Sequence, residues 1–284
     1  MSRIAYVAGQ YLPHRQAAVH IEDRGYQFAD GVYEVIAVVG GHLVDEAPHL
    51  ARLHRSLAEL RIAAPMADAA LKIVIREIVR RNSVDTGIVY IQVTRGVAPR
   101  EHAFPKAATP SLVVTARRTR PPDPRLGDAG IAVITLPDIR WQRCDIKSVA
   151  LVANVLGKQQ AREAGAYEAW QVDRTGWITE GTSTNAWIVT ADGAVVTRAA
   201  DSAILNGVTR LAIFDIMRRE GYRLVERPFT VEEAKGAREA FLTSTTADLL
   251  PVVRIDETPV GDGRPGPLTL KLRAAYFAHA AATP

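Results

Sequence analysis

Short apolar runs alternate with amphipathic stretches along the first 120 residues. Runs rich in β-branched residues predict strands at residues 4–7, 31–39, 88–94 and 112–115. The Gly40-Gly41 pair after the second run predicts a hairpin. Residues 48–60 and 67–81 instead repeat apolar side chains every three or four positions, which predicts two helices.

The part of the chain after residue 126 shows a second mixed pattern. Strands are predicted at 131–136, 167–172, 186–189 and 194–197, and near Leu224 and Phe241. Helices are predicted at 151–164, at 208–219 and from residue 268 onward. Because strands in the first part connect through hairpins rather than through helices, the whole pattern predicts an α+β fold rather than a doubly wound sheet.

Three closely spaced prolines separate these two parts, within residues 120–126. Proline cannot continue a helix or a central strand, so we expect an interdomain linker at this point. The predicted domains are therefore a small N-terminal one, residues 1–119, and a larger C-terminal one, residues 127–284.

Composition and charge exclude several classes of protein. An apolar content of 48% supports a sizeable core, and the single cysteine, Cys144, cannot form an intrachain disulfide. No signal-peptide core and no apolar run of about 20 residues is visible, so we expect a cytoplasmic protein that does not span a membrane. The net charge of +4 comes from arginines and lysines scattered along the chain, which argues against nucleic acid binding. No metal-ligand set is expected.

One lysine, Lys147, stands apart from the other five. It lies in a mostly apolar stretch directly before a predicted helix, whereas the others lie on polar helix faces or in a proline-rich loop. An amine that loses solvation is more easily deprotonated, and the neutral amine is the nucleophile that Schiff-base chemistry requires. The alternative is a structural lysine that pairs with Asp145 at the end of a strand.

A candidate carboxylate, Glu180, lies between an apolar strand and the hydroxyl-rich loop 182–185. A carboxylate in such a place can keep a ring nitrogen of a bound cofactor protonated. A glutamate that caps a helix or closes a turn fits the pattern equally well.

Two hydroxyl-bearing segments are candidates for an anion site. The predicted helix at 208–219 opens with Val208 and Thr209, and the N–H groups at a helix start favour an anion. A second cluster contains Ser244 and Thr245 after a strand, and Arg52 can add a charge-assisted bond. Singly, each feature is also typical of an ordinary helix cap or a surface arginine.

Arg100 and His102 lie in a loop that follows the predicted strand at 88–94. An arginine fork matches the geometry of a carboxylate. The alternative is an exposed loop that binds nothing.

Together these segments resemble the fold-type IV pyridoxal-phosphate transaminases, and within them the bacterial D-amino-acid transaminases. The resemblance runs over nearly the whole chain, and the order and spacing of the motifs carry it rather than any single motif. The motifs are residues 23–28, 30–35, 49–53, 92–96, 99–102, 145–148, 154–156, 179–181, 183–185, 207–210 and 243–246.

The resemblance implies a role for each candidate residue. Lys147 would carry pyridoxal 5'-phosphate and then act as the acid and base of the reaction, and Glu180 would pair with the pyridine nitrogen. Leu205 would pack against the ring. The phosphate would be held by Arg52, Val208, Thr209, Ser244 and Thr245.

The resemblance also implies a substrate and an assembly. Tyr33, Arg100 and His102 match the positions that bind the substrate carboxylate in the D-specific members of the family. That loop reaches in from the partner subunit in the family, so a homodimer is implied. Trp177 and Trp187 are bulkier than the family pattern, which we expect to affect the range of substrate side chains rather than the reaction class.

The implied activity moves the amino group of a D-amino acid such as D-alanine to a 2-oxo acid such as 2-oxoglutarate. The cycle would be ping-pong through a pyridoxamine form, with the active site in the interdomain cleft. Alternatives of the same fold are a branched-chain L-amino-acid transaminase, an amine transaminase and an aminodeoxychorismate-lyase-like enzyme. An alternative from another class is a non-catalytic protein that binds pyridoxal phosphate or another anion, against which the presence of both Lys147 and Glu180 argues.

Overall fold

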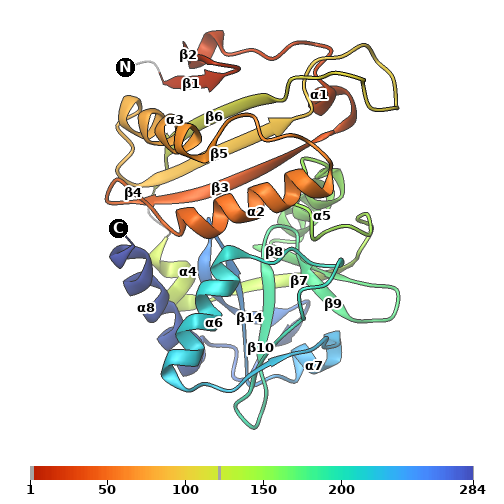
Figure 1. The fold of residues 1–284 in the computed structure, drawn as a ribbon. Coiled ribbons are helices and arrows are strands. Elements are labelled where there is room, and N and C mark those ends of the chain that lie inside the picture. Colours follow the sequence, from red (N-terminus) through yellow and green to blue (C-terminus); the bar gives the residue numbers. More distant parts are fainter. Residues whose placement is uncertain (1–2, 121–122, 284) are drawn as a thin grey trace. The chain divides into compact units, whose positions relative to one another are not determined.

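The computed structural model describes residues 3–120 and 123–283, and these form two compact units (Figure 1). The first unit takes in the N-terminal part of the chain and residues 146–150, and the second takes in residues 123–145 and 151–282. Residues 146–150 therefore pack with the first unit, although their position in the sequence falls in the range predicted for the C-terminal domain. Residues 121–122 of the predicted linker lie outside the described residues.

The first unit is built on a six-stranded antiparallel sheet with strand order β2-β1-β6-β5-β3-β4. The strands are β1 Ile4–Val7, β2 Gln10–Pro13, β3 Gly31–Val39, β4 His42–Leu43, β5 Gly87–Thr94 and β6 Ser111–Arg118. Strand β3 is paired with β5 along almost its whole length, from Gly31 opposite Thr94 to Val38 opposite Gly87. The strand and hairpin predicted at 31–41 are thus confirmed.

Helices cover one face of this sheet (Figure 1). They are α2 Glu46–Glu59 and α3 Asp68–Arg81, while α1 Arg24–Phe28 and the 3-10 helix His14–Gln16 are short. The apolar stripe that predicted the two long helices is buried, and Leu53 and Ile75 join Val32 and Ile36 of β3 in one core. Since side chains alternate across a strand, Tyr33 projects from the opposite face of the sheet.

The second unit contains a nine-stranded mixed sheet with the order β12-β11-β10-β13-β14-β7-β8-β9, and β15 pairs with β14. Its strands are β7 Ile131–Pro137, β8 Glu168–Val172, β9 Ile178–Gly181, β10 Asn185–Val189, β11 Val195–Thr197, β12 Leu224–Glu226, β13 Glu239–Ser244, β14 Asp248–Ile255 and β15 Thr258–Pro259. Its helices are α4 Pro124–Ala129, α5 Val152–Glu163, α6 Val208–Glu220, α7 Val231–Lys235 and α8 Pro267–Ala282.

Both faces of this second sheet are buried. On β10, Ala186 and Ile188 join one apolar core, and Trp187 and Val189 join another in which α6 and α8 take part. Trp187 stacks on Phe241 with 5.2 Å between ring centroids, so its bulk belongs to this core. A strand that is buried on both sides has a continuous apolar run, as residues 186–189 do.

The α+β class is confirmed, and two local predictions differ from the structure. Pro124, in the predicted linker, is the first residue of α4, because proline fits the first helical position, where no N–H partner is needed. Strand β14 was not predicted, and it contains Pro251. This proline precedes the ladder with β7, which starts at Val252, so no bond to that strand is lost. Among the described residues, no helix combines the length and apolar content needed to cross a membrane.

Candidate active site

The segment that carries Lys147 is held against the edge of β3 in the first unit. Tyr33 N donates to Lys147 O at 3.0 Å, Val149 N donates to Gly31 O at 3.0 Å, and Val32 and Ser148 form a β-bridge. Lys147 N also donates to Ser56 Oγ of α2 at 3.3 Å. This pairing fixes the backbone on both sides of the lysine and so limits where its side chain reaches.

The Lys147 amine lies over the ring of Tyr33, which stacks on the ring of Tyr90. Its Nζ lies 4.2 Å from the centroid of the Tyr33 ring, and the Tyr90 ring stacks on that of Tyr33 at 5.7 Å. Burial raises the pKa of Tyr90 to about 12, and its hydroxyl donates to Gln92 Oε1 at 2.7 Å. The structure thus brings together two of the predicted residues, Lys147 and Tyr33.

A buried ion cluster from β3 and α2 holds Arg52. Arg52 Nε donates to Glu34 Oε1 at 2.7 Å and its NH2 group donates to Oε2 at 2.9 Å, while His49 Nδ1 lies 2.8 Å from the same Oε2. Burial favours the neutral acid, but the charge and hydrogen bonds of Arg52 outweigh it and lower the pKa of Glu34 to about 2. Burial, together with the charges of Arg52 and Lys147, lowers the pKa of His49. Glu34 is therefore an anion that fixes the orientation of Arg52.

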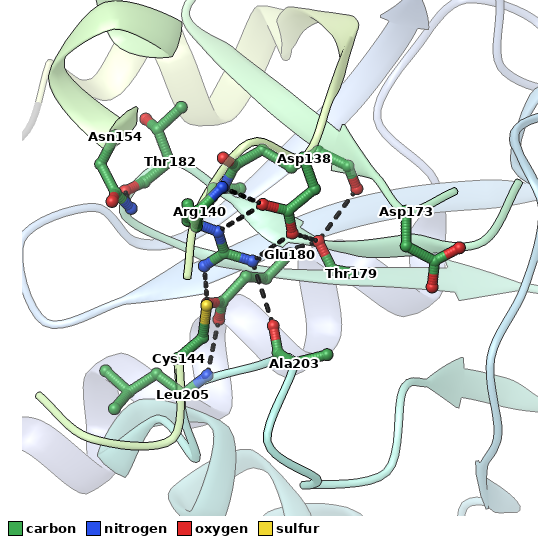
Figure 2. A network of polar contacts seen from close by, with 12 residues as sticks. Asp138, Arg140, Cys144, Asn154, Asp173, Thr179, Glu180, Thr182, Ala203 and Leu205 are labelled. Atoms are coloured by element: carbon green, nitrogen blue, oxygen red, sulfur yellow. Dashed lines mark hydrogen bonds and ion pairs between the residues drawn. The ribbon is translucent and has the colours of Figure 1, made fainter. Parts of the chain in front are cut away.

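In the second unit, Glu180 lies on β9 at the centre of a polar network (Figure 2). Its Oε1 accepts from Arg140, and its Oε2 accepts from Asn185 Nδ2 at 3.1 Å and from Leu205 N at 3.0 Å. Burial raises the pKa of the Glu180 carboxyl, while the guanidinium of Arg140 opposes that shift. A carboxylate accepts about four hydrogen bonds, so these three donors leave capacity for one more.

Arg140 is in turn held by groups of its own unit (Figure 2). Asp138 accepts from its Nε at 3.0 Å and from its NH2 group at 2.7 Å, and Thr179 Oγ1 and Ala203 O take further bonds from that group. Sequence reasoning missed both Asp138 and Arg140. The only signal is an Asp-x-Arg pattern after the strand at 131–137, and the same pattern recurs at Asp123 and Arg125, where the arginine side chain is 88% exposed.

The one cysteine, Cys144, lies beside this network (Figure 2). Its thiol donates to Trp141 O at 3.1 Å, and burial raises its pKa to about 12. Because the thiolate is the reactive form of cysteine, Cys144 is not a nucleophile here.

The N-terminus of α6 provides an anion-binding end. Its cap residue is Gly207, which gives the first turn no side-chain acceptor, and Val208 and Thr209 are buried. A Cβ at position 207 would overlap Asn185 Oδ1, so a larger residue would displace this amide, which also bonds Glu180. The first amide groups of a helix have no intrahelical partner, and here no side-chain cap replaces that partner. Leu205, two residues before the cap, is tied by its N–H to Glu180.

The hairpin between β13 and β14 carries the second predicted hydroxyl cluster. Ser244 Oγ accepts from Ala247 N at 3.0 Å, which closes a turn at residues 244–247. Thr245 lies within that turn and is half-buried. The hydroxyl groups of both residues are thus placed by one short turn.

Arg100 and His102 lie on an exposed loop of the first unit. Both contact Phe28 of α1, with the guanidinium carbon of Arg100 5.1 Å and the His102 ring 5.3 Å from its centroid. The structure therefore places both side chains against the same ring.

Across residues 3–120 and 123–283, no group of three or more His, Cys, Asp and Glu side chains is arranged to hold a metal ion.

Comparisons with known proteins place the chain in a family. The amino-transferase class IV family model matches residues 31–255. A D-alanine aminotransferase of Bacillus licheniformis is 42% identical over 267 residues, which cover 94% of this chain and 93% of that protein.

Solved structures share the fold. A branched-chain amino acid aminotransferase of Escherichia coli superposes with a TM-score of 0.92 at 23% identity, covering 100% of this chain and 96% of that one. Another branched-chain amino acid aminotransferase, that of Thermoproteus uzoniensis with norvaline, gives a TM-score of 0.87 at 23% identity, covering 99% of this chain and 96% of that one. A third such enzyme, from T.th. and with pyridoxamine 5'-phosphate, gives 0.91 at 25% identity, covering 100% and 96%. The family match over most of the chain and the near full-length relative lead to one conclusion: this chain belongs to the class IV aminotransferases.

Proposed function

We propose that this chain is a pyridoxal-phosphate transaminase that moves the amino group of D-alanine or a similar D-amino acid to a 2-oxo acid. The observation that carries the proposal is the combination of Lys147 and Glu180 with the Arg100-x-His102 pair, in a chain 42% identical to a D-alanine aminotransferase. The branched-chain relatives share the fold at 23–25% identity and support no substrate assignment.

The residues present fit pyridoxal phosphate. Glu180 is a buried carboxylate with capacity for one more donor, as a protonated pyridine nitrogen requires. The start of α6 offers amide donors without a side-chain cap, which suits the phosphate dianion. Thr209, Ser244 and Thr245 would add hydroxyl groups, Arg52 would add a guanidinium aligned by Glu34, and Leu205 would contact the ring.

When bound, pyridoxal phosphate supplies an aldehyde carbon that amines attack and a ring that takes up electron density from the substrate. Lys147 would hold it covalently in the resting enzyme. The Lys147 Nζ would also be the base that takes the proton from the substrate Cα and the acid that returns one. Glu180, whose Oε1 accepts from Arg140, would accept the hydrogen bond of a protonated ring nitrogen.

Tyr33, Arg100 and His102 would bind the substrate carboxylate. A guanidinium forks onto a carboxylate with two parallel hydrogen bonds, and a tyrosine hydroxyl or histidine N–H adds a third donor. Fixing the carboxylate while Lys147 reaches Cα from one side determines which enantiomer presents its Cα–H to the amine. The proposal is that this arrangement selects D-amino acids.

A homodimer is part of the proposal. On α5, the exposed residues Val152, Val155 and Leu156 recur at helical spacing, with 75%, 64% and 50% of their surface accessible. An apolar stripe of this kind on a single chain supports burial against another subunit. Light scattering should give twice the mass of one chain.

A spectroscopic and kinetic comparison tests the function. The protein loaded with pyridoxal phosphate should lose its visible absorbance on addition of D-alanine without an acceptor, and regain it with 2-oxoglutarate. L-alanine at equal concentration should change it far more slowly. An equal or faster response to L-alanine would contradict the D-specific assignment.

A variant tests the carboxylate site. Arg100→Ala removes a charge-assisted fork worth about 1.5–3 kcal/mol, so KM for D-alanine should rise about 10-fold or more. Binding of pyridoxal phosphate should stay within about twofold, since Arg100 is not proposed to touch the cofactor. Unchanged D-alanine kinetics would reject Arg100 as a ligand.

A further inference from the structure

The loop at residues 97–104 is exposed, but its base is anchored in the first unit. Val97 forms a β-bridge with Asp23, and Arg24 N donates to Gly96 O at 2.9 Å. Gly96 has φ +99°, and a Cβ there would overlap Thr109 O, so the entry and exit of the loop meet where only glycine fits. These contacts fix the base of the loop. The tip, which carries Arg100 and His102, is held by other residues.

One carboxylate, that of Asp30, bridges two buried arginines below this loop. Its Oδ2 accepts from Arg24 Nε at 2.8 Å and from Arg95 Nε at 2.7 Å, and its Oδ1 accepts from Arg95 NH2 at 3.0 Å. The side chains of Arg24 and Arg95 are 4% and 8% exposed. Two guanidinium groups this close and this buried would repel each other without the carboxylate between them.

Arg24 connects the Asp30 carboxylate to the tip of the loop through hydrogen bonds. Its NH1 group donates to Glu101 O at 2.5 Å and its NH2 group to His102 O at 3.4 Å. Its guanidinium also lies 4.8 Å from the centroid of Phe28, the ring that Arg100 and His102 contact. Arg24 thus holds both the backbone and the aromatic surface on which the two side chains rest.

Arg95 holds the other side of the loop. Its NH1 and NH2 groups donate to Arg61 O at 2.9 Å and to Leu60 O at 2.7 Å, at the end of α2. The guanidinium carbon lies 3.7 Å from the centroid of Phe104, the last residue of the loop. Asp30 therefore connects two arginines. Arg24 bonds the backbone at the tip of the loop, and Arg95 contacts the end of the loop and the residues that follow α2.

We propose that Asp30 is a positioning residue for substrate recognition: by orienting Arg24 and Arg95 it fixes the loop that presents Arg100 and His102 to the substrate carboxylate. This inference rests on the proposed function for the role of the loop. It goes further by assigning the selectivity of the site to a buried charge cluster that does not touch substrate or cofactor. Burial favours a neutral Asp30, but the bonds and charges of Arg95 and Arg24 lower its pKa, so it stays charged at neutral pH.

The variant Asp30→Asn tests this role in the holoenzyme. The amide keeps the size of the side chain but loses the charge that both arginines require. By analogy with the hydrogen-bond partners of metal ligands, whose loss costs about 10–100-fold, KM for D-alanine should rise at least about 10-fold. The rate constant kcat and the Kd for pyridoxal phosphate should stay within about threefold, which separates positioning from general damage. Amide hydrogen exchange at residues 97–104 should become faster.

Glu77 provides a matched control. Its carboxylate also accepts from two arginines, Arg80 and Arg81, but all three lie on the exposed face of α3. Glu77→Gln should leave both KM and exchange at residues 97–104 as in the wild type. If Asp30→Asn does not fold, Arg24→Lys replaces it, because lysine keeps the charge and loses the fork to the two loop carbonyls.

Each outcome decides a separate point. Raised KM with faster loop exchange, in Asp30→Asn or Arg24→Lys but not in Glu77→Gln, supports the inference. Wild-type KM together with wild-type exchange in the folded variant overturns it, even when Arg100→Ala raises KM. Absence of D-alanine turnover in the wild type, with faster loop exchange in Asp30→Asn, overturns the proposed function while the anchoring of the loop stands.

Discussion

Two of the three Asp-x-Arg pairs in this chain make the same local bonds but differ in burial. Arg140 and Arg125 each bond the aspartate two residues before them through Nε and NH2, and each backbone N–H bonds the same carboxylate. The Arg125 side chain is 88% exposed, whereas that of Arg140 is 5% exposed and also bonds Glu180. The sequence pattern is the same in both places, so the sequence could not identify Arg140.

This pair gives a prediction with its own control. Arg140→Lys keeps a positive charge but cannot serve Asp138, Glu180 and Ala203 together, so the carboxylate of Glu180 loses its alignment. Turnover of D-alanine should fall about 10–100-fold, by analogy with the loss seen when the hydrogen-bond partners of metal ligands are removed. Arg125→Lys should leave turnover unchanged. Equal turnover in the two variants would show that Arg140 does not support Glu180.

Asp248 gives a prediction about pH. It opens β14 with φ +55°, and burial raises its pKa to about 6, against the opposing charge of Arg273. A raised carboxyl pKa means that the folded protein binds this proton more tightly than the unfolded chain. The stabilisation is thus complete below about pH 4 and is lost as the pH rises to about 6, by up to about 3 kcal/mol.

Asp248→Asn removes this dependence, and asparagine also tolerates a positive φ. The variant should unfold at a higher temperature than the wild type at pH 7.5, and the difference should shrink toward pH 4. Thermal scans of both proteins over this range measure it. A constant difference across the range would mean that Asp248 does not titrate there.

At the scale of elements, the first turn of helix α8 is capped by a carboxylate from strand β13. Glu239 of β13 accepts from Leu268 N at 3.1 Å, from Thr269 N at 2.8 Å and from Thr269 Oγ1 at 2.7 Å, and so caps the first turn of α8. Capping by a charged acceptor contributes about 1–3 kcal/mol.

Glu239→Ala should therefore lower the free energy of unfolding by about 2 kcal/mol or more, since the buried amides lose their acceptor. Urea titration followed by circular dichroism measures the change. Glu257→Ala is the control, because this glutamate is 97% exposed, and it should have little effect. A similar midpoint for both variants would rule out the capping role.

The elements that the sequence predicts well are those whose local pattern agrees with their burial. Strand β3 and helix α6 begin where the pattern places them, because β-branched runs and an apolar stripe match what the fold buries. Strand β14 escaped prediction because Pro251 argues against a central strand, and only the tertiary register shows that this proline precedes the ladder with β7. Helix α4 was not predicted because the prolines at its start were interpreted as a linker.

At the scale of the whole molecule, the sequence offers candidates for the chemistry of the site but not the residues that hold those candidates in place. Lys147, Glu180, Arg100 and His102 are candidates because their motifs resemble those of a known family. Asp30 and Arg140 are not, because their roles depend on which side chains the fold brings to them across tens of residues. A local pattern contains no information about such partners.

If Lys147 carries the cofactor, reduction of the bound aldehyde should attach a stable label to this lysine. The purified protein, incubated with pyridoxal phosphate and reduced with borohydride, would be digested and its peptides identified by mass spectrometry. We expect one pyridoxyl label per chain, on the peptide that contains Lys147, and no label in Lys147→Ala. A stoichiometric label on another lysine, or none at all in the wild type, would contradict it.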